Sequence, residues 1–154
     1  MGKVVLGFLA ALATAYVVAV LGYSQLNLGA LVEMGMPVTG GVRFDTFMHD
    51  LVGMTALYLP ILAIALLIGF AVAAVILRWT PHIYTLGYIS AGFVAVFVVD
   101  FALQSAFGTH PIAVTRTLVG LLSQCLAGAL GGYVFSLIVG PRYRARTQPA
   151  MSRA

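Results

Sequence analysis

Residues 51–77, LVGMTALYLPILAIALLIGFAVAAVIL, decide the fold because they form a long apolar run without a charged residue. A helix needs about 20 mainly apolar residues to cross the hydrocarbon core of a membrane. Unpaired backbone groups are too costly in lipid for such a run to be an isolated strand. The stretch therefore predicts a membrane-spanning helix.

Three other runs are also long and mainly apolar, and the whole composition agrees with them. Of all residues 62% are hydrophobic and 8% are charged, and the mean hydropathy is +1.06, whereas a soluble domain has about 25% charged residues. We therefore expect residues 1–154 to form a single all-α membrane domain, an antiparallel bundle of four transmembrane helices. The predicted spans are about 4–22, 51–77, 83–107 and 112–139.

The basic residues indicate the orientation in the membrane, because Lys and Arg concentrate on the cytoplasmic side. Arg43 and Arg116 fall on one side of a four-span path, and the other basic residues fall on the opposite side. Both termini are therefore predicted to be cytoplasmic, in a bacterial inner membrane. The net charge of +4 follows from these flanking residues, so we expect membrane lipid and no nucleic acid as a partner. The residues on the predicted cytoplasmic side are Lys3, Arg78, Arg142, Arg144, Arg146 and Arg153.

The predicted outer loop, residues 23–50, is too long to lack structure of its own. Residues 26–36 are mostly apolar and predict a short helix on the outer leaflet. A second, amphipathic helix is predicted to run straight into the second span, because its apolar residues recur at i, i+3, i+4 and i+7. These residues are Phe44, Phe47, Met48 and Leu51.

Prolines predict further features of the helices. Pro60 lies inside the predicted second span, where it removes a backbone donor and predicts a kink. Thr80 and Pro81 suit the start of the third helix, and Gly140 with Pro141 predicts the end of the fourth. Residues 140–154 would then form a cytoplasmic tail.

Polar residues of the outer side offer two interpretations. Asp45 and His49 are spaced i, i+4, and together with Asp50 and His110 they could hold a borderline metal such as zinc. Alternatively, the acids lie near the positive end of a helix dipole and the histidine is solvated. The sequence contains no metal motif such as His-Glu-x-x-His and identifies no cofactor.

Asp100 lies inside the predicted third span, where an ionised carboxylate is costly unless it is paired or wetted. Arg116, across a short loop, is the simplest partner, and this pair would fasten the third helix to the fourth. Alternatively, Asp100 belongs to a ligand-binding or proton-handling site that also includes Gln104, Arg116 and Gln124.

Small residues predict close packing of the fourth helix. Gly120, Gly128 and Gly132 share one face with Gln124, and Gly131 lies beside them. Glycines four residues apart allow membrane helices to approach closely. We expect this seam to support the bundle and a homo-oligomer or a contact with a partner membrane subunit.

Three functions remain open, because no catalytic motif accompanies these residues. The first is a non-catalytic oligomeric module or accessory subunit that binds a lipid or small ligand at the outer leaflet. The second is a transporter or channel formed between subunits and using Asp100. The third is a membrane enzyme or metal-binding protein with its Asp, His and Arg residues at the outer face. We favour the first.

Overall fold

The computed structural model describes residues 2–107 and 117–147, and these residues are mostly helical and contain no strand. Four of the helices, α1, α3, α4 and α5, are long and apolar enough to cross a membrane. The predicted all-α class with four candidate spans is therefore confirmed. The elements are α1 (Gly2–Glu33), α2 (Gly40–Gly53), α3 (Tyr58–Ile76), the 3-10 turn η1 (Pro81–Ile83), α4 (Tyr84–Phe107) and α5 (Leu118–Thr147).

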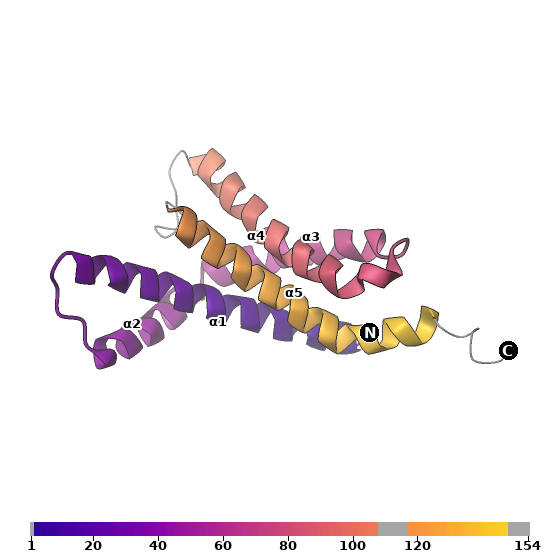
Figure 1. Ribbon diagram of the computed structural model, residues 1–154, viewed down its shortest axis with the longest axis horizontal. Helices are drawn as coiled ribbons and strands as arrows, with labels where there is room; N and C mark the ends of the chain where they lie inside the picture. Colours follow the sequence, from indigo (N-terminus) through magenta and orange to yellow (C-terminus); the bar gives the residue numbers. More distant parts are fainter. Residues whose placement is uncertain (1, 108–116, 148–154) are drawn as a thin grey trace.

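The helices pack around α5, which contacts both α1 and α4, while α3 packs mainly against α4. Figure 1 shows the start of α1, the α3–α4 turn and the end of α5 at one end of the molecule, on the right. We call this the basic end, because it carries Lys3 and Arg78. The opposite end carries α2, and we call it the α2 end.

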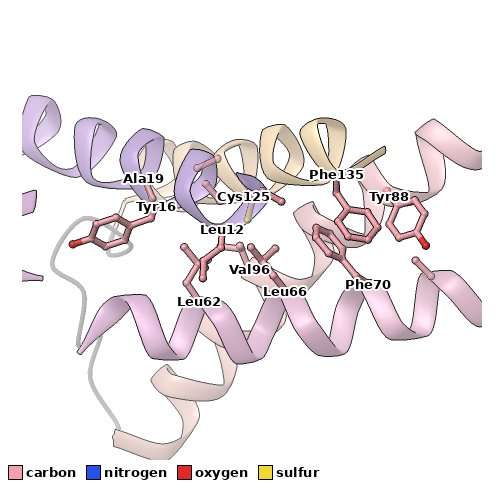
Figure 2. Close-up of a cluster of buried hydrophobic side chains, with 14 of the residues drawn as sticks. Leu12, Tyr16, Ala19, Leu62, Leu66, Phe70, Tyr88, Val96, Cys125 and Phe135 are labelled. Carbon is pink, nitrogen blue, oxygen red and sulfur yellow. The ribbon is translucent and has the colours of Figure 1, made fainter. Parts of the chain in front are cut away.

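The core changes in character between these two ends. Toward the basic end, Phe70, Tyr88 and Phe135 bring α3, α4 and α5 together, with centroids of the Phe70 and Phe135 rings 4.7 Å apart. Aliphatic side chains fill the middle, where Cys125 also lies, and Tyr16 lies on the side away from Phe135 and Tyr88 (Figure 2).

Helix α1 is longer than the predicted first span, which ends at Gly22. Ser24 and Leu28 remain buried because they continue the face that packs against the bundle. The helix ends in a Schellman motif, in which Met36 N donates to Leu31 O over 3.1 Å and Gly35 has φ 81°. Much of residues 26–36 therefore belongs to α1 and does not form the separate helix that we expected.

Helix α2 is capped by Thr39, whose side chain accepts a hydrogen bond from Val42 N over 3.5 Å. It does not continue into the second span, because residues 54–57 form a turn before α3 begins at Tyr58. Pro60 therefore lies in the first turn of α3, where helical N–H groups have no intrahelical partner anyway. In place of the predicted kink at Pro60, the chain has a break between α2 and α3 at residues 54–57.

The remaining ends also refine the predictions. Pro81 opens η1, while the Thr80 hydroxyl donates back to Ile76 O over 3.3 Å and does not cap the turn. Thr117 Oγ1 accepts a hydrogen bond from Gly120 N over 3.1 Å at the start of α5, and the predicted earlier start at residue 112 lies outside the described residues. Helix α5 continues past Pro141 to Thr147. Gly140 and Pro141 therefore do not end this helix, contrary to the prediction.

Glycines of α5 allow the three central helices to touch through their backbones. A Cβ atom at Gly128 would collide with Gly92 O, and one at Gly132 would collide with Tyr88 O, both in α4. A Cβ atom at Gly131 would lie 2.8 Å from Ala11 O in α1. These glycines pack within the chain, so a homo-oligomer, which stays a prediction, would need other surfaces.

Candidate functional site in the buried polar cluster

Gln124 lies at the centre of a hydrogen-bonded chain that joins three helices. Tyr58 Oη donates to Gln124 Oε1 over 2.8 Å, and Gln124 Nε2 donates to Ala19 O over 3.1 Å. Gln124 is 2% exposed, so this amide has little access to water. In an apolar interior such a polar group needs partners, and the two bonds provide them from α3 and α1.

A second tyrosine holds the turn between α2 and α3. Tyr16 Oη donates to Leu51 O over 2.6 Å and lies 3.0 Å from Thr55 Oγ1. Its ring packs near that of Tyr58, with centroids 6.2 Å apart. Tyr16 and Tyr58 therefore link the position of α2 to the interior of the bundle.

Asp100 is the only acidic side chain that is buried in the described part of the chain. It is 6% exposed, and neither of its carboxylate oxygens has a hydrogen-bond partner among the described residues. Its charge is close enough to interact electrostatically with the Tyr58 hydroxyl and the Cys125 thiol. A carboxylate thus lies among buried groups that cannot neutralise its charge.

The helix register places Asp100 at a defined point of this cluster. Gly92 meets Gly128 and Tyr88 meets Gly132, so α4 and α5 run past each other in opposite directions. Steps of four residues in this register bring Asp100 opposite Gly120, which is one turn from Gln124. The small Gly120 is buried, so α5 presents no bulky side chain there.

Ser24 provides a further buried hydroxyl from α1. It is 0% exposed, and its Oγ has no hydrogen-bond partner among the residues the structure describes. Ala19 contacts Gln124, and a Cβ atom at Gly22 would lie 3.4 Å from Ser123 Oγ. This register brings Ser24 toward the same part of α5 as Asp100. We call Ser24, Tyr58, Asp100, Gln124 and Cys125 the buried polar cluster.

The structure does not gather the predicted metal ligands among its described residues. Asp45 and His49 are exposed on α2, and Asp50 is half-buried. Within 2–107 and 117–147, no group of three or more His, Cys, Asp or Glu side chains could hold a metal ion. His110 lies outside the described residues, so a site that includes it stays a prediction.

Two predicted members of the Asp100 site also lie outside the description, namely Arg116 and the side chain of Gln104. The Asp100–Arg116 ion pair therefore stays a prediction. Arg43, the other basic residue of the predicted outer side, donates from Nη1 to Gln25 Oε1 over 2.6 Å and so ties α2 to α1.

Tyr58, Ser24 and Cys125 are the cluster members that were not predicted from the sequence as site residues. Each is a single polar residue within an apolar context and belongs to no motif. For Tyr58 a usable signal existed, because the hydroxyl of a buried tyrosine normally has a hydrogen-bond partner. Ser24 was assigned to a loop, and the continuation of α1 is what makes it internal.

Removing the Tyr58 hydroxyl tests the energetic role of this network. We expect Tyr58→Phe to lower the free energy of unfolding by about 1–2 kcal/mol, because Gln124 Oε1 loses its donor in a buried site. Thermal unfolding in detergent measures the change. The half-buried Tyr23 provides the control Tyr23→Phe, and an equal loss in both variants would contradict a specific role for the Tyr58–Gln124 bond.

Comparisons of the chain with protein-family models, curated proteins and solved structures give no match.

Proposed function

We propose that the protein is a small, non-catalytic integral membrane module that binds a proton at Asp100. The observation that carries this proposal is the burial of Asp100 without a hydrogen-bond partner among the described residues. Asp100 lies within the candidate span Tyr84–Ala102. Ionisable residues inside membrane spans are rare and commonly mark ligand or proton sites.

The free energy of the ionised carboxylate supports this role. Transfer of an isolated charge into an apolar medium is so unfavourable that the group becomes neutral or acquires a partner. The described neighbours Tyr58 and Gln124 already bond to each other, and Cys125 is a buried thiol. A proton neutralises Asp100 without any rearrangement of these residues.

The available ligands favour a proton over a hard metal cation. Calcium takes six to eight oxygen ligands, and magnesium requires an octahedral shell. The cluster offers the hydroxyl oxygens of Ser24 and Tyr58 and the amide oxygen of Gln124, which is already engaged. A protonated Asp100 needs no such shell, and it can donate one hydrogen bond itself.

Carbodiimide labelling tests the proposal. Dicyclohexylcarbodiimide enters apolar sites and reacts with protonated carboxyl groups, so we expect mass spectrometry of the full-length protein to locate the adduct at Asp100. Labelling should decrease as the pH rises and should disappear in Asp100→Asn. The exposed Asp45 provides the matched control, since Asp45→Asn should leave the yield unchanged. Labelling that is absent from Asp100 at every pH would overturn the proposal.

For the membrane arrangement, we propose an antiparallel bundle with cytoplasmic termini in a bacterial inner membrane. The basic end would then be cytoplasmic, in agreement with the distribution of Lys and Arg. At the α2 end, Met34, Phe44 and Val52 are exposed apolar side chains. They support our proposal that α2 lies at the outer leaflet and contacts lipid, a small ligand or a partner subunit, including a second copy.

Transport is the second candidate function, because an intramembrane carboxyl group that exchanges a proton can also couple its movement across the bilayer. In this case a path between subunits would use Asp100. Proton flux into liposomes that contain the protein distinguishes the two functions. A flux that Asp100→Asn removes supports transport, whereas labelling of Asp100 without flux supports a binding module.

A further inference from the structure

An apolar groove runs between α3 and α4, and its volume of about 510 Å³ lies within the usual range of ligand pockets, about 300–1,000 Å³. The groove exists because small residues line it and leave space between the larger side chains. Where α3 meets α4, a Cβ atom at Gly69 would lie 2.8 Å from Ala95 Cβ. The small lining residues are Ala65, Gly69, Ala73, Gly87, Ala91 and Ala95.

One end of the groove reaches the α3–α4 turn, where Ile76 and Ile83 belong to its lining. Arg78 and His82 are exposed at this turn. Trp79 between them is 81% exposed, although a large aromatic side chain is seldom left so open to water. At this end, the apolar groove therefore adjoins a short segment of basic and aromatic residues.

Other charges strengthen the positive character of this end. Lys3 is exposed on the first turn of α1, and Figure 1 shows that this turn and the end of α5 lie at the same end of the molecule as the α3–α4 turn. The last turns of α5 carry Arg142, Arg144 and Arg146. All four acidic residues of the chain lie elsewhere, namely Glu33, Asp45, Asp50 and Asp100.

We propose that the α3–α4 groove and the adjoining turn bind an anionic phospholipid. One acyl chain occupies the groove, and the phosphate contacts Arg78 and His82. Trp79 lies at the level of the headgroups, where tryptophan is enriched in membrane proteins. Each Lys or Arg near the membrane surface contributes about 1 kcal/mol to the binding of anionic lipid, which corresponds to about a fivefold gain in affinity. This site is separate from the proposed proton site at Asp100.

Charge complementarity favours lipid over a second copy of the chain as the occupant. A twofold dimer uses the same surface on both copies. Pairing the groove faces in a parallel dimer would bring Arg78 and His82 close to the same residues of the other copy. An anionic lipid covers the same apolar lining and neutralises these charges.

Trp79 is the only tryptophan of the chain and reports directly on the site. The full-length protein is placed in vesicles of phosphatidylcholine that contain a small fraction of brominated phosphatidylglycerol or brominated phosphatidylcholine. Bromine quenches tryptophan fluorescence at short range. We expect the brominated anionic lipid to quench Trp79 at about fivefold lower mole fraction than the neutral one.

Two variants separate the headgroup and acyl-chain contributions. Arg78→Gln with His82→Gln should lower the preference by about fivefold, and Ser90→Phe, which fills the groove from an exposed lining position, should weaken quenching by the anionic lipid. Arg43→Gln at the α2 end is the control and should retain the preference. Circular dichroism verifies that each variant is folded.

Several outcomes would overturn this site. Equal quenching by both lipids excludes anionic selectivity, and a preference that the Arg78 and His82 substitutions do not lower excludes the turn as the headgroup site. A preference that Ser90→Phe does not change indicates attraction by surface charge without a groove site. If residues next to Trp79 can be cross-linked between two copies of the chain, and neither brominated lipid quenches Trp79, the occupant is a second copy.

Discussion

In detergent at alkaline pH, where few protons are available to Asp100, the variant Asp100→Val is expected to unfold at a higher temperature than the parent protein. The variant replaces a buried carboxylate that has no partner among the described residues with an apolar side chain. Leaving such a group unsatisfied costs about 1–3 kcal/mol, so the free energy of unfolding should rise by a similar amount. Thermal unfolding followed by circular dichroism measures the difference.

A structural ion pair with Arg116 predicts the opposite result. Removing one partner of a buried ion pair leaves the other charge uncompensated and costs about 3–5 kcal/mol. Asp100→Val would then be strongly destabilised, and Arg116→Gln would show a comparable loss. The sign of the stability change therefore distinguishes an interhelical fastener from an exchangeable proton site.

Gly132→Ala is expected to have the largest effect on folding of any single methyl group added to α5. Its Cβ atom would collide with Tyr88 O, and a backbone atom cannot move aside as a flexible side chain can. Overpacking of a tight core costs about 1–3 kcal/mol and occasionally more, and here α4 and α5 must separate. We expect a loss at the upper end of this range or no recoverable folded protein.

Gly29 provides the matched control, because it also lies within a membrane-length helix, but a Cβ atom there would meet no other element or side chain of the described residues within 4 Å. Gly29→Ala should be neutral or stabilising by up to about 1 kcal/mol, through the higher helix propensity of alanine. Thermal unfolding of both variants in the same detergent makes the comparison. Equal stability of Gly132→Ala and Gly29→Ala would contradict the close contact of α4 with α5.

The predictable part of the fold is the part that local composition controls. Long apolar runs such as residues 51–77 can satisfy their backbone in lipid only as helices, so four spans follow from the sequence. The ends of the helices were less predictable. Gly22 and Pro141 both suggested a helix end, yet α1 and α5 pass through them, because packing and backbone continuity outweigh a single unfavourable residue.

For the candidate site, single residues were predictable and their partners were not. The cost of a carboxylate in a span identified Asp100, and the need of an amide for partners identified Gln124. Tyr58 and Ala19 contact Gln124 from distant parts of the chain. Such contacts depend on the rotation and register of each helix. A membrane helix is apolar on all its faces, so its sequence does not show which face turns toward which neighbour.

The proposed function depends on the protonation state of Asp100, which infrared difference spectroscopy of the carboxyl group measures. The spectrum of the reconstituted protein at acidic minus alkaline pH is compared with that of Asp100→Asn. A protonated carboxyl group has a carbonyl band that is separate from those of the ionised carboxylate. We predict this band in the parent protein at acidic pH, its loss at alkaline pH and its absence from the variant. A carboxylate at Asp100 that stays ionised throughout, as in a fixed ion pair, would contradict the account.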